Sequence, residues 1–173
     1  MTASDNVITA VEQLTGPVFR LIHRIVRDRD EALDLTQDVL VRVLREQPRL
    51  RDPERLKPYV LRAGYNAALN ARRNRSRRSR LHNEIQRSTS DRYSSGSADP
   101  FESRETRKVI AQAMTNLSDK QREAVSLRFF GNLSTAETAS AMKITEGSVK
   151  VHLARGLRNL QALLAPLRNK EDI

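Results

Sequence analysis

The sequence predicts an all-α protein made of two small helical domains joined by a flexible linker. Along most of the chain, apolar residues recur at spacings of three and four, the periodicity of a helix with one buried face. No stretch shows the alternation of apolar and polar residues that is typical of a half-buried strand. Between Ser79 and Pro100 the sequence is polar, Ser-rich and nearly aperiodic, as linkers are. We therefore expect an N-terminal domain over residues 1–78, a linker over 79–100 and a C-terminal domain over 101–173.

Four helices are expected in the N-terminal domain. A weak helix covers about residues 5–14, and a second begins at Gly16-Pro17, because proline is tolerated in a first turn. A third spans about 29–46, and the fourth runs from near Tyr59 into a run of arginines. The segment 47–57 between the last two is rich in proline and is expected to be a loop.

Four more helices are expected in the C-terminal domain, over about 100–116, 119–130, 134–142 and 146–164. Two of them open with capping boxes, Ser118 to Gln121 and Ser134 to Glu137. Gly131 is expected to end the second helix, and Thr145 can cap the last. The inner face of the last helix is expected to consist of Val149, Leu153, Leu157, Leu160 and Leu164.

Charge and composition narrow the possible functions. Lys and Arg number 31 against 21 Asp and Glu, which gives a formal charge of +10 and favours a polyanionic partner. The absence of Cys excludes disulfides, thiolate zinc sites and a catalytic thiol. No apolar run approaches the ~20 residues that span a bilayer, and the N-terminus does not resemble a signal peptide. A cytoplasmic location is the simplest expectation.

Acidic and basic residues are segregated along the N-terminal domain. No acidic residue lies between Glu54 and Glu84, whereas five acidic residues fall within residues 28–38. Separate acidic and basic surfaces suggest two different partners.

The last two predicted helices, with a short turn between them, form a helix-turn-helix pattern. The second helix of this motif enters the major groove of DNA. Its outward residues are donors, acceptors and cations suited to bases and phosphates: Glu146, Ser148, Lys150, His152 and Arg155. The alternative is an ordinary helical hairpin with a solvated charged face.

The stretch LSDKQREAVSLRFFGNLSTAETASAMKITEGSVKVHLARGLRNLQ resembles the promoter-binding C-terminal domain of bacterial sigma factors, most closely the extracytoplasmic-function (ECF) group. The resemblance implies that the helix-turn-helix reads the minus-thirty-five element of promoters. In two places the chain departs from the family pattern. Lys143 stands in the turn where glycine is usual, and Thr138 replaces the usual isoleucine. A left-handed backbone at Lys143 would cost about 1–2 kcal/mol.

A second stretch, RDRDEALDLTQDVLVRVLRE, resembles the helix with which sigma factors hold the RNA polymerase clamp. Asp34, Gln37, Asp38 and Val41 share one helix face at spacings of three and four. A solvated helix face is the alternative. The resemblance implies that this face binds core RNA polymerase.

A third stretch, YVLRAGYNAALNARRNRSRR, resembles the segment that reads and melts the minus-ten element. Asn66 and Asn70 match the family's reading positions, and two amides at i, i+4 lie on one helix face. Tyr65 could either stack on a base or pack in the core, and Tyr59 is expected to pack in the core. Arg72 and Arg73 are expected to hold backbone phosphates, and the later arginines to act diffusely. By resemblance, the loop 47–57 accepts a flipped base.

The expected function is a sigma factor that binds core RNA polymerase and promoter DNA, both as duplex and as melted strand. The resemblance also implies an anti-sigma factor of unknown identity. We expect no cofactor, no metal, no small-molecule substrate and no direct membrane insertion. The alternative is a stand-alone helix-turn-helix regulator that binds duplex DNA without polymerase. A catalytic role is not expected, because the three His residues are scattered and no carboxylate pair lies in an apolar setting. The basic stretch also lacks the apolar face of a membrane-surface helix.

Overall fold

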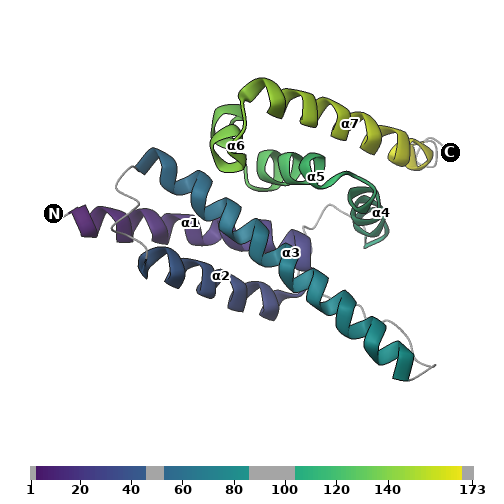
Figure 1. The fold of residues 1–173 in the computed structure, drawn as a ribbon, viewed down its shortest axis with the longest axis horizontal. Helices are drawn as coiled ribbons and strands as arrows, with labels where there is room; N and C mark the ends of the chain where they lie inside the picture. Colours follow the sequence, from purple (N-terminus) through teal and green to yellow (C-terminus); the bar gives the residue numbers. More distant parts are fainter. Residues whose placement is uncertain (1–2, 46–52, 86–103, 169–173) are drawn as a thin grey trace. The chain divides into compact units, whose positions relative to one another are not determined.

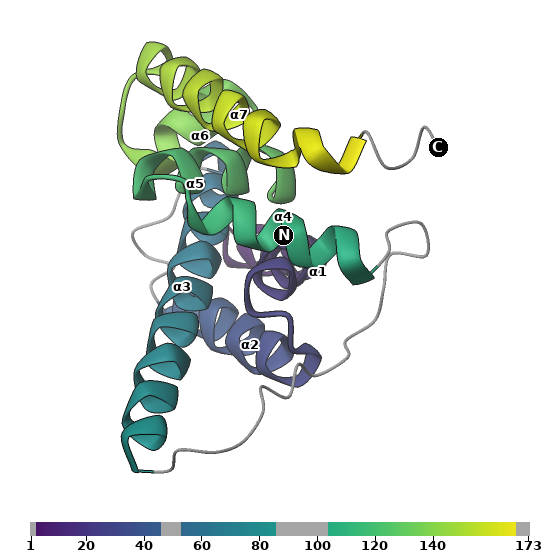
Figure 2. The ribbon, with the colours of Figure 1, turned by 90° about the vertical axis from the view of Figure 1, so that its right-hand side faces the viewer.

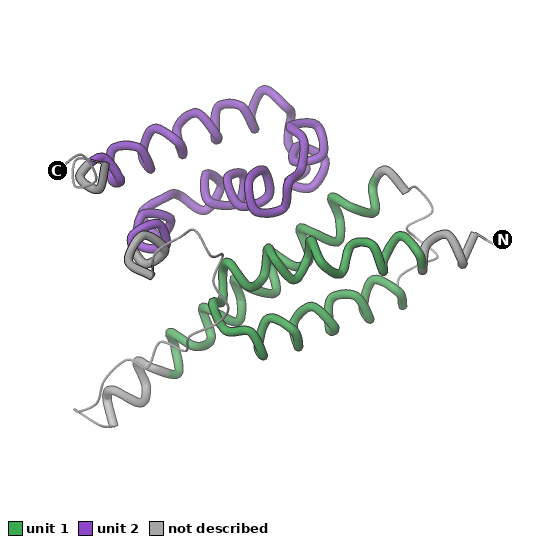
Figure 3. The backbone as a smooth tube through the Cα atoms, turned by 180° about the vertical axis from the view of Figure 1, so that it is seen from behind, with its two compact units in different colours: residues 1–97 green, residues 98–173 purple. Residues whose placement is uncertain are grey.

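A computed structural model describes residues 3–45, 53–85 and 104–168, and the side chains of residues 9–45, 55–78 and 109–165. Within these ranges the chain forms helices and turns but no strand, so the all-α prediction is confirmed (Figure 1). The chain divides into two compact units, residues 1–97 and 98–173 (Figure 3).

Unit 1 contains three described helices, α1 (Ala3–Val26), α2 (Arg29–Arg45) and α3 (Pro53–Ile85). α1 packs against both other helices, and α2 also packs against α3. Each helix buries one stripe, and that of α1 consists of Val11, Leu14, Val18, Leu21, Ile22 and Val26. The last turns of α3 project beyond the other two helices (Figure 2).

α1 is a single helix, so the prediction of two helices before residue 27 is wrong. Pro17 lies inside α1. A proline in a helix interior costs about 3 kcal/mol, since it removes a hydrogen bond and crowds the preceding turn. Leu14 and Val18, on either side of Pro17, are both buried. The buried apolar stripe therefore continues on the same side of α1 before and after Pro17. The burial of these side chains offsets the free-energy cost of the proline.

α3 is longer at both ends than its sequence indicates. It begins at Pro53, where a first-turn proline fits, and it continues through Pro58. The segment Pro53–Lys57 is thus helical rather than loop, while the rest of the predicted loop, residues 47–52, lies outside the described residues. At the other end, α3 runs past Arg78 to Ile85, so its last seven residues lie in the segment 79–100 that we expected to be linker.

The buried stripe of α2 consists of Ala32, Thr36, Val39 and Val43. Thr36 is the polar member of this stripe, and its hydroxyl donates a hydrogen bond to the Ala32 carbonyl oxygen at 2.6 Å. Leu33 lies outside this stripe and is 42% exposed.

Unit 2 contains α4 (Arg104–Thr115), α5 (Asp119–Val125), the π-helical turn η2 (Ser126–Phe130), α6 (Thr135–Met142) and α7 (Glu146–Arg168). One buried cluster of Met114, Leu117 and Val125 is covered by Ile110, Phe130, Leu153 and Leu160. α7 comes close to α5 at Gly156, where an added Cβ would lie 3.1 Å from Val125 Cγ2.

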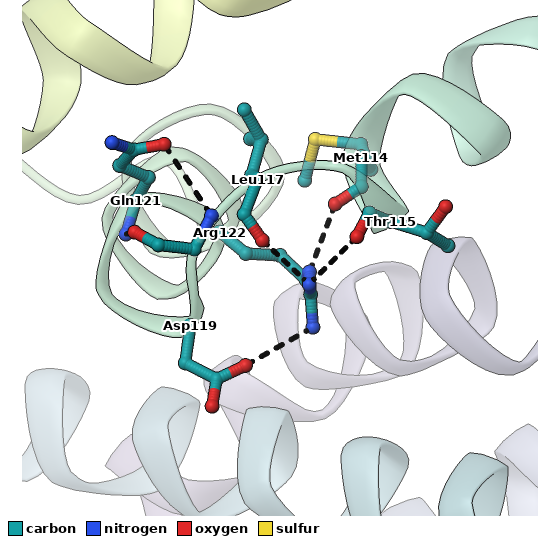
Figure 4. A network of polar contacts seen from close by, with 7 residues as sticks. Met114, Thr115, Leu117, Asp119, Gln121 and Arg122 are labelled. Atoms are coloured by element: carbon teal, nitrogen blue, oxygen red, sulfur yellow. Dashed lines mark hydrogen bonds and ion pairs between the residues drawn. The ribbon is translucent and has the colours of Figure 1, made fainter.

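Arg122 joins α4 to α5 through backbone carbonyls (Figure 4). Its guanidinium donates to the carbonyl oxygens of Met114 at 2.9 Å, Thr115 at 3.1 Å and Leu117 at 2.7 Å. The last carbonyls of a helix have no partner within the helix. Arg122 thus satisfies acceptors at the end of α4 and is a structural cation.

Both predicted capping boxes are confirmed. Ser118 with Gln121 opens α5, and Ser134 with Glu137 opens α6. The predicted helix 119–130 instead changes to π-helical geometry at Ser126. Gly131 ends it without a positive φ; an added Cβ there would lie 2.7 Å from the Leu127 carbonyl oxygen, so glycine is required for space.

The turn before α7 is left-handed at Lys143, with φ 56° and ψ 46°. A side chain in this region brings Cβ close to the carbonyl oxygen, which costs about 1–2 kcal/mol. The strain that the sequence suggested for this position is therefore present in the helix-turn-helix.

We predict that Lys143→Gly stabilises unit 2 by about 1 kcal/mol, because glycine adopts this conformation without strain. Urea denaturation of the full chain by circular dichroism gives the free energy of unfolding, and amide hydrogen exchange assigns the change to unit 2. Asn132→Gly is the matched control. Asn132 is also left-handed, but asparagine tolerates that region better, so its gain should be smaller. A loss of stability in Lys143→Gly would contradict the prediction.

Candidate functional site

α3 has one buried side and one exposed side, and the exposed side carries the candidate base-reading residues. Its buried residues are Leu56, Pro58, Val60, Leu61, Gly64, Tyr65 and Ala68. Asn66 and Asn70 are both exposed, one turn apart. Each residue turns a helix by about 100°, so the spacing from Tyr59 through Arg62, Asn66 and Asn70 to Arg73 keeps all five on one face. The outward side of α3 therefore presents the two amides, with the half-buried Arg62 one turn before them and the exposed Arg73 one turn after them.

The structure decides between the two roles left open for Tyr65, and it places Tyr59 outside the core in which we expected it. Tyr65 is only 4% exposed, so it packs in the core of unit 1 and is not available to stack on a base. Tyr59 is 37% exposed and lies two turns before Asn66 on the same face. The spacing of seven residues between Tyr59 and Asn66 was the signal that could have identified it.

The arginines of α3 differ in their roles. Arg73, Arg77 and Arg78 are exposed, whereas Arg72 is half-buried at the side of the asparagine face. Arg75, expected to act diffusely, instead donates from Nη1 to the Val26 carbonyl oxygen at 3.2 Å and pairs with Glu31 of α2. Arg75 thus ties α3 to the corner between α1 and α2.

The candidate polymerase-binding residues of α2 all face outward. Asp34, Gln37, Asp38 and Val41 are exposed on the side opposite the buried stripe of α2. Val41 is 45% exposed, and Leu33, also exposed, lies beside this face. Acidic carboxylates repel DNA phosphates, and exposed apolar side chains favour protein contact. This face is suited to a protein partner.

α6, a three-residue turn and α7 form the predicted helix-turn-helix. Thr145 caps α7, since its hydroxyl oxygen accepts from the Ser148 backbone N–H at 3.2 Å. The same oxygen lies 2.9 Å from the Ser148 hydroxyl, which is therefore already engaged. Val149 is fully buried and sets the rotation of α7. Thr138, in place of the usual isoleucine, is also fully buried, and its hydroxyl donates to the Ser134 carbonyl oxygen at 2.7 Å.

The five candidate DNA-binding residues of α7 are unequally accessible. Glu146, Lys150 and Arg155 are exposed, whereas Ser148 and His152 are half-buried. Other exposed residues of α7, Val151 and Arg158 among them, were not identified from the sequence. Leu157, expected on the inner face, is 43% exposed. Steps of four residues drift about 40° around a helix, so two such steps from Val149 carry Leu157 out of the core.

In the part of the chain that the structure describes, no group of His, Cys, Asp or Glu residues is arranged to hold a metal ion. No helix among the described residues is both long and apolar enough to span a membrane.

Comparison with known proteins matches both units. The family model described as Sigma-70 region 2 matches residues 10–78, and that described as Sigma-70, region 4 matches residues 107–160. The RNA polymerase sigma-E factor of Streptomyces avermitilis is 30% identical over 144 residues, which are 83% of this chain and 76% of the relative. The ECF RNA polymerase sigma factor SigM of Bacillus subtilis is 25% identical over 146 residues, 84% of this chain and 87% of the relative.

A solved structure shares the fold. It is the sigma factor RpoE in complex with the anti-sigma factor NepR from Bartonella quintana, with a TM-score of 0.59 and 21% identity over 93% of this chain and 95% of that chain. The candidate base-reading face of α3 falls in the region 2 match, and the helix-turn-helix falls in the region 4 match. The chain therefore belongs to the sigma-70 family of RNA polymerase sigma factors, in its ECF group.

Proposed function

We propose that the chain binds core RNA polymerase, directs it to specific promoters and stabilises the melted strand at initiation. The observation that carries the proposal is the presence of both matched units in one chain, each with an exposed face suited to a different partner. A stand-alone helix-turn-helix regulator requires only unit 2 and leaves the outward faces of α2 and α3 without a role. The chain itself catalyses no reaction in this proposal, since the polymerase performs the chemistry, and it acts in the cytoplasm.

The polymerase contact is assigned to the acidic face of α2, made of Asp34, Gln37, Asp38 and Val41. All four are exposed, and Val41 supplies an apolar centre among acceptors. Desolvated apolar area contributes affinity, while the surrounding charges contribute orientation and association rate.

The melted minus-ten strand is assigned to the outward face of α3. Asn66 and Asn70 each offer a donor and an acceptor to unpaired base edges. Tyr59 shares their face and replaces Tyr65 as the stacking residue, a contact worth about 1–3 kcal/mol per base. Arg72 and Arg73 follow on the same helix and would hold the phosphates of that strand.

The duplex minus-thirty-five element is assigned to α7. The first turns of a recognition helix contact base edges in the major groove. Glu146, Ser148 and His152 lie in those turns beside Lys150, and Arg155 follows one turn later. The exposed cations Lys150 and Arg155 are assigned to phosphates or guanine.

A further partner is an anti-sigma factor. The solved structure that shares the fold holds such a protein. Carried over to this chain, the likeness supports a protein inhibitor that covers the polymerase-binding or promoter-binding faces until it is released.

We predict that Asn66→Ala with Asn70→Ala reduces open-complex formation roughly tenfold or more, because each lost hydrogen bond removes about 1 kcal/mol. Permanganate reactivity of unpaired thymines measures melting, and co-elution with core polymerase measures complex formation, which should be unchanged. Gln13→Ala, which removes an exposed amide from α1 of the same unit, is the control. Transcription by the double variant equal to that of the parent would refute base reading by α3.

We predict that Lys150→Ala with Arg155→Ala weakens binding to the duplex element and lowers the slope of log affinity against log salt by about 2, one unit per lost phosphate contact. Titrations of the full chain with polymerase at several salt concentrations give the slope. Lys120→Ala is the control, because Lys120 belongs to the same unit but pairs with Glu123 at 3.4 Å. An unchanged slope in the double variant would exclude phosphate contact by these residues.

A further inference from the structure

An apolar side chain, that of Val151, lies on the outward face of the recognition helix α7. Val149 is fully buried, and Gly156 is pressed against α5. Val151 follows Val149 by two residues, a rotation of about 200°, so it points away from the core. It is 47% exposed.

Neither folding nor helix propensity explains valine at this position. A β-branched residue is a weaker helix former than the straight-chain residues usual on an exposed face. Almost half of the surface of Val151 is open to solvent, so this part is not used by the core. Its apolar surface is therefore available to a partner.

The residues along the same face leave room for close approach. Gly147 lies one turn before Val151, and Ala154 follows it; both are exposed. A Cβ added at Gly147 would meet only Thr145 Oγ1, at 3.9 Å, so nothing described in the chain requires glycine there. A small residue at this point lets the first turn of α7 come closer to a surface.

The charges beside Val151 indicate which surface that is. Lys150 and Arg155 are exposed on either side of it, and Arg158 follows. Exposed cations on both sides of an apolar side chain are complementary to a surface that has phosphates at its edges and an apolar group at its centre. In the major groove of DNA, the apolar group is the C5 methyl of thymine.

We propose that Val151 reads a thymine methyl group in the duplex promoter element. The inference rests on the proposed function and deepens it, since it makes Val151 a specificity-determining residue. It requires an A·T pair opposite the middle of the outer face of α7. Polar residues at the sides of the helix then read neighbouring pairs by hydrogen bonds.

The test uses the full chain with core RNA polymerase on a promoter selected by the unmodified protein from a library. Each thymine of the upstream element, on either strand, is replaced in turn by deoxyuridine, which lacks only the methyl group. For the parent protein, one replacement should weaken promoter binding about fourfold, the effect of one buried methyl-sized group. For Val151→Ala, the thymine and deoxyuridine promoters should bind equally at that position.

Leu163→Ala is the matched control, because Leu163 is a similarly exposed apolar residue, 42% exposed, further along α7. This variant should retain the preference for thymine. The proposal is overturned if the parent discriminates at no position, if the discrimination survives in Val151→Ala, or if the selected element contains no A·T pair. It is also overturned if Val151→Ala lowers polymerase binding instead, which would make Val151 a protein contact.

The proposal and the function on which it rests fail differently. Promoter-directed transcription without a methyl effect would contradict the role of Val151 and leave the proposed function intact. Absence of promoter-directed transcription would overturn both.

Discussion

The crossing of α3 over α1 at Gly64 is the contact on which the candidate site of unit 1 depends. A Cβ at this position would lie 3.2 Å from Val18 Cγ1, closer than most side-chain contacts, so the two helices are held near each other. When one side of a helix packs against a core, only its opposite side is exposed to a partner. With Gly64, Tyr65 and Ala68 turned inward, Asn66 and Asn70 must face outward. Gly156 has the same effect in unit 2, where it brings α7 against α5 and turns Val151 and Arg155 away from the core.

The basic residues divide into those that hold the fold and those that remain for a partner. Arg122 satisfies three carbonyl oxygens near the end of α4, and Arg75 joins the end of α1 to Glu31 of α2. Neither is a free phosphate-binding group in this arrangement. The 31 Lys and Arg residues are therefore not equivalent as DNA contacts, and exposed cations such as Lys150 and Arg155 are the relevant ones.

The starts of α5 and α6 could be predicted from the sequence, because a capping box satisfies the free backbone N–H groups with side chains from the same four residues. The rotation of each helix was less predictable. Successive steps of four residues from Val149 led us to place Leu157 on the inner face, although such steps rotate gradually away from the core. The sequence left both sides of α3 open for Tyr65, and the contact of Gly64 with α1 turns Tyr65 inward. The continuity of α1 through Pro17 was missed for a related reason, since tertiary burial overrides a local helix breaker. Family resemblance identified Asn66 and Asn70 as candidate base-reading residues, but only the packing of α3 placed Tyr59 on the same face.

Run-off transcription with core RNA polymerase on a library of promoter sequences tests the central claim most directly. The account predicts that the chain forms a complex with core polymerase and yields transcripts from a small subset of templates. That subset should share an upstream duplex element and a downstream element that melts. The account would be contradicted by a chain that binds duplex DNA alone but forms no complex with core polymerase at physiological salt and directs no promoter-specific transcript.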